Sequence, residues 1–268
     1  MNKRLVILVV MVLLFTLFGL GKSNLFGPKI DAPVFVKSLI YSEDMDIDLN
    51  YIAPRRFNKS VEKVQIPNAP KGIDCVVYGE EKEAEGKYTV STVNIGVNCD
   101  YWNEETGIGN DLELNRVLVT WNDGSQTTED IGRITIVGGN RNKQGNNYMD
   151  ITEHGDTRKA TYTLTKDTEI TGLKFPYPDE LLNIISNITI NDRPLEDVSI
   201  ERPIKLKKNE TCIVEYQVND ENKFQFGNIH VTGSLLGKSN KSGESIANFV
   251  LLKRFGSDES ARGYFNKK

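Results

Sequence analysis

The sequence has few of the residues that carry catalytic or metal chemistry. Its 268 residues include only two histidines, three cysteines and two tryptophans. Histidine is the most frequent catalytic base, but His154 and His230 belong to no His-x-x-x-His pattern, and no Cys-x-x-Cys pattern occurs. A Gly-x-Ser-x-Gly motif, which marks a serine nucleophile, is also missing. The sequence therefore predicts no catalytic residue, no metal ligand and no cofactor.

Positive charges are slightly outnumbered by negative ones. The chain carries 33 Lys and Arg against 37 Asp and Glu, with a formal net charge of −4. Nucleic-acid-binding proteins concentrate cations on one face, so this balance argues against nucleic acid as a partner. The basic, glycine-rich loop Gly138–Asn147 lacks the Gly-Lys-Ser/Thr ending and the following helix that phosphate binding requires.

One long apolar run stands at the start of the chain. Lys3 and Arg4 precede an uncharged stretch from Leu5 to Leu20, which predicts export with the N-terminus inside and the rest outside. Its length falls between a signal-peptide core of about 7–15 residues and a membrane helix of about 17–25. Residues 1–23 are therefore either a cleaved signal peptide or an N-terminal membrane anchor that spans through residues 5–21. We expect a single-pass cell-membrane protein with an extracytoplasmic C-terminal region, or a secreted one if cleavage occurs.

Alternation of apolar and polar residues dominates the remaining chain and predicts an all-β fold. Val117, Val119 and Trp121 alternate with other residues and then meet Asn122–Gly124, which is typical of a tight hairpin. A second long strand is predicted over 88–99, after a charged turn over 80–86. The only helical signal is Pro178–Ile185, where Pro, Asp and Glu suit a first turn.

Three short segments recur in the same order in the second half of the chain. The copies are 93, 97 and 95 residues apart, and the pairs are Asn94–Asn98 with Asn187–Asn191, Val119–Asp123 with Tyr216–Asp220, and Gly132–Gly138 with Gly227–Gly233. A period of this size matches one β-sandwich domain and is far longer than a solenoid repeat. The alternative is that any two β domains share short strings of this kind.

The segment Pro203–Tyr216 resembles the central hairpin of bacterial immunoglobulin-like modules. An apolar-x-Leu strand, Ile204–Leu206, turns through polar residues into the alternating run around Cys212, Val214 and Tyr216. Together with the repeat, this resemblance implies two tandem immunoglobulin-like β-sandwich domains after the N-terminal hydrophobic helix. The expected organisation is a signal or anchor over 1–23, a linker and leading strand over 24–59, β-sandwich domain 1 over 60–150, a connector over 151–165, β-sandwich domain 2 over 166–255 and a disordered tail over 256–268.

The cysteines and an aspartate series each leave two interpretations open. Cys75, Cys99 and Cys212 all occupy the apolar phase of strand-like runs, so they are either three buried thiols or a Cys75–Cys99 bridge with one thiol. The run Asp44–Asp48 fails the EF-hand pattern, because its sixth and twelfth positions hold Leu49 and Arg55. It is either a half-buried strand with its aspartates facing solvent or a calcium site of another type.

The candidate binding surface lies on loops, where binding residues collect on a rigid β scaffold. It consists of two aromatic and four polar or basic side chains: Tyr101, Trp102, Asn140, Arg141, Asn142 and Lys143.

We expect a non-enzymatic binding, adhesion or envelope-assembly protein, whose partner is an envelope protein or a cell-surface polymer. One alternative is a carbohydrate-binding module, which requires Tyr101, Trp102 and Trp121 exposed in one plane. A second is a secreted hydrolase, which requires a pocket that holds paired carboxylates or His154 with acidic neighbours. A third is a passive spacer.

Overall fold

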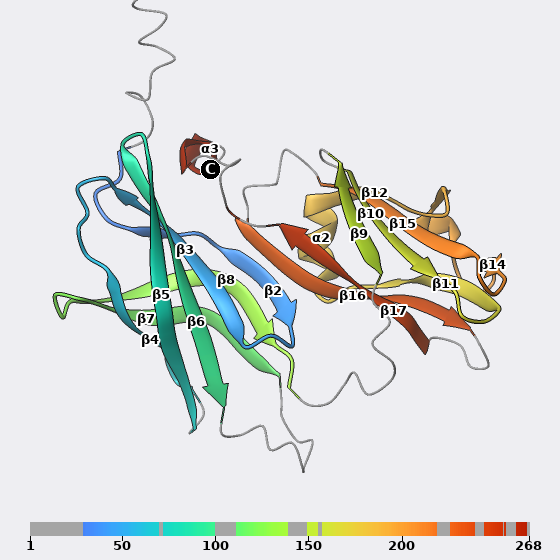
Figure 1. Cartoon of the computed structure of the whole chain (residues 1–268), viewed down its shortest axis with the longest axis horizontal. Coiled ribbons are helices and arrows are strands. Elements are labelled where there is room, and N and C mark those ends of the chain that lie inside the picture. Colours follow the sequence, from blue (N-terminus) through green and yellow to red (C-terminus); the bar gives the residue numbers. More distant parts are fainter. Residues whose placement is uncertain are drawn as a thin grey trace, which may run out of the picture.

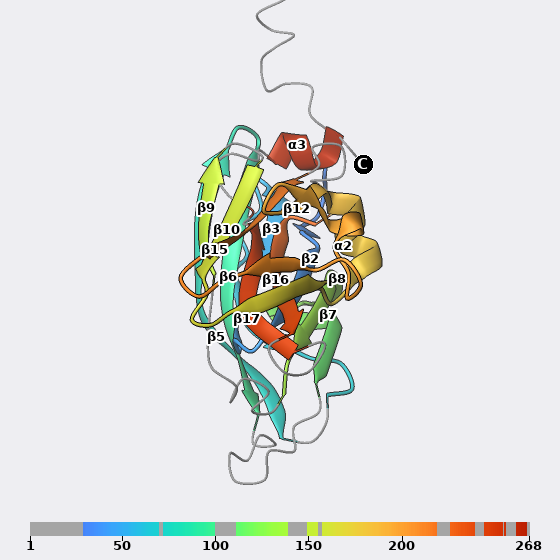
Figure 2. The same ribbon diagram turned by 90° about the vertical axis from the view of Figure 1, so that its right-hand side faces the viewer.

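The computed structural model describes residues 29–69, 72–99, 111–138, 149–154, 157–218, 226–238, 244–253, 255 and 261–266, and most of them are in β-strands. The predicted all-β class is confirmed. Figures 1 and 2 show strands stacked in face-to-face layers, with few helices at the periphery. We refer to residues 29–138 as the N-terminal half and to residues 149–253 as the C-terminal half.

Three sheets account for the strands. The four-stranded sheet has the order β1 (Val34–Phe35), β3 (Asp46–Pro54), β6 (Tyr88–Cys99) and β5 (Ile73–Glu85). The five-stranded sheet has the order β13 (Arg193–Pro194), β12 (Ile185–Ile190), β15 (Thr211–Val218), β10 (Thr157–Thr163) and β9 (Asp150–His154). The eight-stranded sheet has the order β14 (Ile204–Leu206), β11 (Thr168–Lys174), β16 (Asn228–Lys238), β2 (Ser38–Ser42), β8 (Gln126–Ile136), β7 (Leu112–Trp121) and β4 (Val61–Gln65), with β17 (Glu244–Lys253) beside β16.

The eight-stranded sheet contains strands of both halves, and β2 joins them. β2 pairs in parallel with β8 on one edge, where Ser38 opposes Gly132, and in parallel with β16 on the other, where Ser38 opposes Asn228. β17 runs along β16 from Ile229 to Gly237. The other edge of β16 pairs with β2 along its first part and with β11 along its second part. We call this junction the seam.

The core of the N-terminal half lies between the four-stranded sheet and strands β4, β7 and β8. Alternation along β7 buries Val117, Val119 and Trp121, as its sequence predicts. Tyr51 packs against Trp121 with ring centroids 5.6 Å apart. Its hydroxyl donates to the carboxylate of Glu80, and burial raises the pKa of Tyr51 well above its usual value. The contact of Tyr51 with Trp121 joins the two layers of this half, whereas Tyr51 and Glu80 lie in the same layer.

The core of the C-terminal half lies between the five-stranded sheet and strands β11, β16 and β17. Its members are mostly aliphatic, and they include Cys212, which is fully buried. Helix α2 (Pro178–Ile184) packs on this core through Leu181 and Ile184. The predicted helix is confirmed, with Pro178 in its first turn and Asp179 and Glu180 beside the positive end of its dipole.

The C-terminal segment differs from the predicted disordered tail. Residues Ala261–Asn266 form helix α3. The ring of Tyr264 is fully buried, 5.9 Å from that of Phe255, and Phe265 lies 5.9 Å from Tyr88 of the four-stranded sheet. Figure 1 shows α3 beside the upper ends of β3 and β5. Contacts with aromatic residues that are distant in the sequence order this segment. Short-range sequence patterns do not reveal such contacts.

Two other segments are strands where the sequence predicted irregular structure. The predicted connector 151–165 contains most of β9 and all of β10, which pair as a hairpin. The predicted charged turn 80–86 is largely the continuation of β5, and only Gly86 and Lys87 form the turn. In both cases the backbone hydrogen-bonds to a neighbouring strand, so polarity alone indicated loops incorrectly.

Strand pairing supports the predicted repeat at one of its three places. Gly132–Gly138 and Gly227–Gly233 lie at β8 and β16, the two strands that flank β2. The other copies are not equivalent, because β12 pairs with β15 whereas β6 and β7 belong to different sheets. Short strings of alternating residues therefore recur here without equivalent strand order.

Candidate binding groove at the seam

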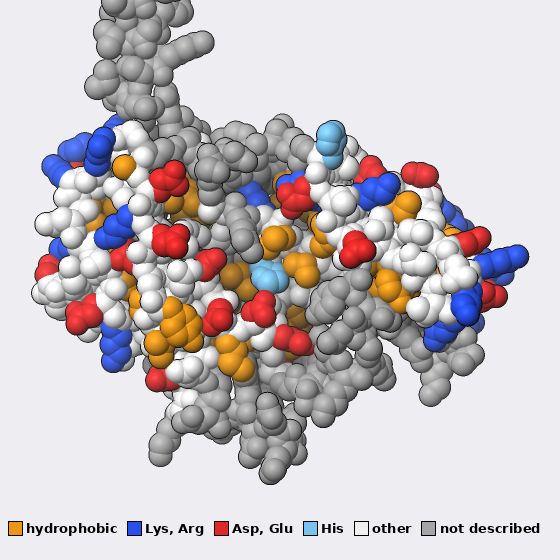
Figure 3. Space-filling model, in the orientation of Figure 1, with side chains coloured by type: hydrophobic (Ala, Val, Ile, Leu, Met, Phe, Trp, Pro, Cys, Tyr) orange, Lys and Arg blue, Asp and Glu red, His pale blue; other side chains and the backbone are white. Residues whose placement is uncertain are grey.

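The seam carries a groove of about 460 Å³ on one face of the eight-stranded sheet. Figure 3 shows this face of the molecule, with a hollow between its two ends. The groove is lined by β2 and the residues after it, by Val137, and by side chains of β16 and β17: Tyr41, Ser42, Glu43, Asp44, Val137, His230, Thr232, Ser234, Ser245, Asn248 and Val250.

Strand alternation explains why polar side chains line the groove. Along β16, Ile229 and Val231 enter the core of the C-terminal half, so His230 and Thr232 point to the opposite face. β17 behaves in the same way, with Phe249 in the core. His230 was predicted to point away from the apolar face, and it does. It is half-buried, however, and lines a concave surface.

Hydrogen bonds within and between strands fix part of the lining. The hydroxyls of Ser234 and Ser245 both donate to Oδ1 of Asn248, at 3.0 and 3.3 Å. Ser42 Oγ accepts the backbone N–H of Asp44 at 3.0 Å and holds the turn that follows β2. The lining thus combines hydroxyls, an amide, an imidazole and two carboxylates. These groups bind polar ligands by hydrogen bonds and attract positive charge.

The opposite face of the seam is closed by a cluster around Tyr177, which precedes α2. The Tyr177 hydroxyl donates to Thr135 Oγ1, and its ring lies 5.8 Å from that of Tyr41. The guanidinium of Arg133 lies 4.2 Å from the Tyr177 ring centroid and forms an ion pair of 2.7 Å with Glu180. Burial raises the pKa of Tyr177. This cluster, the Tyr177 cluster, connects β2 and β8 with α2.

Tyr177 itself has an unusual backbone. It adopts the left-handed conformation, with φ 55° and ψ 52°. Bulky residues are rarely found there, because the Cβ crowds the backbone. The surrounding contacts hold the residue in place, which makes the Tyr177 cluster a rigid support beneath the groove.

Asn228 connects the two halves beside the groove. Its Nδ2 donates to the carbonyl of Asp48 at 3.3 Å, and its Oδ1 accepts the backbone N–H of Phe255 at 2.8 Å. A single buried side chain therefore joins β16, β3 and the segment that leads to α3.

The predicted binding surface of Tyr101, Trp102, Asn140, Arg141, Asn142 and Lys143 lies outside the residues that the structure describes. The groove is formed by other residues, of which only Asp44 appeared in a sequence-based hypothesis, as part of the possible calcium site. The one available signal was the position of His230 on the polar phase of an otherwise apolar strand.

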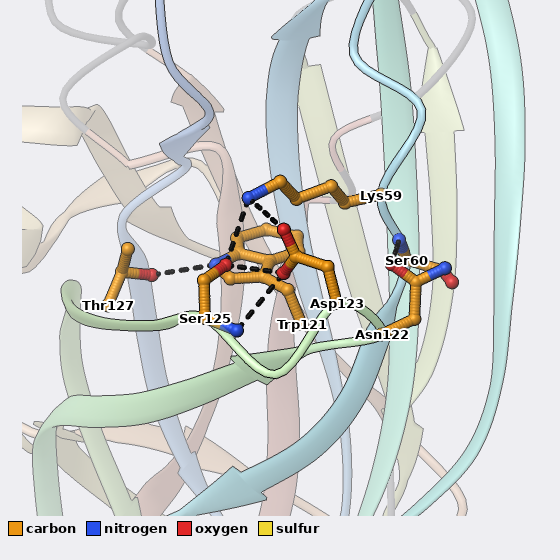
Figure 4. A network of polar contacts seen from close by, with 7 residues as sticks. All are labelled: Lys59, Ser60, Trp121, Asn122, Asp123, Ser125 and Thr127. Carbon is orange, nitrogen blue, oxygen red and sulfur yellow. Dashed lines mark hydrogen bonds and ion pairs between the residues drawn. The ribbon is translucent and has the colours of Figure 1, made fainter.

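Trp121 cannot belong to an exposed aromatic platform, because only 2% of its surface is accessible. It ends β7, and its indole N–H donates to Thr127 Oγ1 at 3.1 Å. The predicted hairpin follows it, with Gly124 in the left-handed conformation at φ 79°. Figure 4 shows the network that secures this turn, in which Lys59 contacts Asp123 at 2.6 Å. The Lys59 and Ser125 contacts hold the pKa of Asp123 well below its usual value.

The structure also describes the aspartate run of β3 and His154. β3 buries Ile47 and Leu49 and exposes Asp46 and Asp48, as expected of a half-buried strand. Within the described ranges, no group of three or more His, Cys, Asp or Glu side chains is placed to hold a metal ion. His154 is the exposed last residue of β9.

The cysteines lie on strands, as predicted. Cys212 is a buried thiol whose pKa is raised by burial to about 12. Cys75 opposes Val97 on β6, two positions from Cys99. The bridge between Cys75 and Cys99 stays a prediction.

No helix in the described part of the chain combines the length and apolar character needed to cross a bilayer, and the predicted membrane segment, residues 5–21, lies outside that part.

Comparison with known proteins gives little further information. No protein-family model and no curated protein matches the chain. A protein of unknown function from Porphyromonas gingivalis W83 is similar over 82% of this chain and 96% of its own, at 10% identity and a TM-score of 0.22. The E. coli chaperone DraB is similar over 83% of this chain and 97% of its own, at 9% identity and a TM-score of 0.22. At these values the likeness supports no conclusion about fold or function.

Proposed function

We propose that the chain is a non-enzymatic binding or envelope-assembly protein that holds a partner in the groove at the seam. The partner is an envelope protein or a cell-surface polymer. Residues 1–23 place the chain outside the membrane as a signal peptide or an anchor, and the two halves act as tandem immunoglobulin-like modules. The groove is the observation that carries this proposal, because it is concave, polar and rigidly supported by the Tyr177 cluster.

The support comes from geometry and not from a reactive group. The groove is open on one face of a sheet, and Asn248 of β17 already accepts hydrogen bonds from Ser234 of β16 and from Ser245 of its own strand. Such a surface is pre-organised, so the groove itself loses less conformational entropy when a partner binds. Shape and hydrogen bonding are the properties that a binding protein needs.

The test is capture of envelope components on the immobilised full chain. Ser245→Arg places a long cation at the exposed rim of the groove. Thr152→Arg makes the same change on the exposed face of β9 and serves as the matched control. We expect one component to be retained by the wild type and by Thr152→Arg and lost with Ser245→Arg. Equal retention by both variants would place binding elsewhere, and no retention by the wild type would favour a spacer.

A hydrolase is the second candidate, because the groove brings His230 to the same surface as Glu43 and Asp44. Imidazole and carboxylate groups can act together in acid–base catalysis. Incubation of the chain with envelope polymers, followed by measurement of released reducing ends and amines, tests this candidate. Release that is abolished by Glu43→Gln would support hydrolysis, and absence of release would leave the binding proposal in place.

A further inference from the structure

An exposed apolar patch lies beside the groove, on the outer face of the four-stranded sheet. Met45, Val76 and Tyr78 have exposed fractions of 39%, 38% and 63%, although buried positions are usual for such residues. Figure 3 shows apolar side chains gathered over the lower parts of β5 and β6, on the same face as the hollow. We call these three residues the Tyr78 patch.

The ring of Tyr78 lies against the sheet because the neighbouring strand has a glycine there. A Cβ built on Gly96 would meet the Tyr78 hydroxyl oxygen at 2.2 Å. Gly96 opposes Val76 on one side and Asp46 on the other. The aromatic ring and the carboxylate of Asp46 therefore flank the same glycine. A ring face beside a carboxylate can bind a cation by cation–π attraction and by charge-assisted hydrogen bonds.

The same chain segment connects the Tyr78 patch to the groove. Glu43 and Asp44 line the groove, Met45 belongs to the patch, and Asp46 begins β3. Among the residues that the structure describes, no Lys or Arg lines the groove, and none forms an ion pair with Asp44 or Asp46. In Figure 3, acidic side chains surround the lower part of the hollow, and basic ones lie mainly towards the two ends. This surface attracts positive charge.

We propose that the groove and the Tyr78 patch together bind a basic, extended segment of a partner protein. One Arg or Lys of that segment stacks on Tyr78 and donates to Asp46, and a second cation lies in the groove near Glu43 and Asp44. This inference rests on the proposed function and specifies the partner. The carboxylates of Asp44 and Asp46 favour a cationic peptide over a neutral glycan, and they repel an anionic polymer.

The probe is a fluorescent ten-residue peptide of alternating Arg and Ser, with the Glu–Ser peptide of equal length as its counterpart. Fluorescence anisotropy with the full chain should show binding of the Arg–Ser peptide alone, weakened by added salt. The double substitution Asp44→Asn with Asp46→Asn should weaken binding about three- to tenfold, since each exposed charge contact contributes modestly. Glu62→Gln removes an exposed carboxylate from β4 and should change binding less than about twofold.

Tyr78 is tested by two substitutions that keep Gly96 covered. Tyr78→Leu removes the π face and should weaken peptide binding about two- to fivefold, whereas Tyr78→Phe keeps it and should bind as the wild type does. Equal binding of both peptides, or equal effects of the Asp double variant and Glu62→Gln, would overturn the inference. So would a soluble neutral glucan that binds with no response to these variants. If Ser245→Arg still abolishes envelope capture in any of these cases, the proposed function stands and only the partner is wrong.

Discussion

The two faces of the seam differ in how completely they are packed. On one face, Tyr177 fills the space between α2, β2 and β8, and Arg133 covers its ring. On the other, side chains that include His230 and Thr232 of β16 line an open groove. Because side chains alternate along a strand, neighbouring residues of β16 point to opposite faces of the sheet. The comparison indicates that the closed face holds the halves in register and leaves the open face available for a ligand.

The largest effect is expected from Tyr177→Ala, which removes the centre of the closed face. Loss of a buried aromatic side chain costs about 3–5 kcal/mol of the free energy of unfolding. Urea denaturation measures it, with Tyr177→Phe as the control that keeps the ring and loses only the hydrogen bonds of the hydroxyl to Thr135 and to the Ile40 carbonyl, at about 1 kcal/mol each. Similar stability of Tyr177→Ala and the wild type would show that the closed face does not join the halves.

Gly132→Ala should have the next largest effect. Gly132 has φ 91°, and an added Cβ would lie 2.3 Å from the carbonyl oxygen of Ser38 on β2. Backbone strain of this kind costs about 1–3 kcal/mol. Gly79→Ala is the matched control, because nothing lies within 4 Å of its Cβ position. Equal thermal stability of both variants would contradict close packing of β2 against β8.

The core beside the seam should lose stability at high pH. Burial raises the pKa of Cys212 from 9.0 to about 12, so the folded state keeps a proton that the unfolded state releases. Its stabilising contribution is complete below pH 9 and falls as pH rises from 9 towards 12, by about 1.4 kcal/mol per pH unit. Urea unfolding at pH 8 and pH 10 measures this. Cys212→Ala should show a smaller pH dependence; an unchanged one would mean that other groups cause the effect.

The smallest effect is expected on the groove side. Thr232→Val keeps the shape of the side chain and removes a hydroxyl from the groove lining, so stability should change by less than about 0.5 kcal/mol. Thermal denaturation is sufficient to measure this. A loss above about 2 kcal/mol would mean that the groove side also supports the fold and would weaken the contrast between the two faces.

The sequence predicted much of the local structure and little of the assembly. Alternation predicted β6, β7 and β15, and the Pro, Asp and Glu of the first turn predicted α2, because these signals depend on neighbours in the chain. The pairing of Ser38 with Asn228 could not be predicted, because it joins residues 190 positions apart and neither carries a local signal. The groove depends on this pairing, so the sequence could not predict the groove either. Tyr264 was misjudged for the same reason, since its burial depends on Phe255 and the four-stranded sheet.

The position of β2 has a consequence for the order of folding. Ribosomes release the N-terminal half first, and domains that are complete can fold as they emerge. Here β2 obtains its second neighbour only when β16, residues 228–238, has been made. Until then one edge of β2 exposes unpaired backbone groups, which can pair with other chains. The N-terminal half therefore cannot complete its strand pairing until the last fifth of the polypeptide has been synthesised. We expect a chain truncated before β16 to aggregate and not to form a soluble N-terminal fragment.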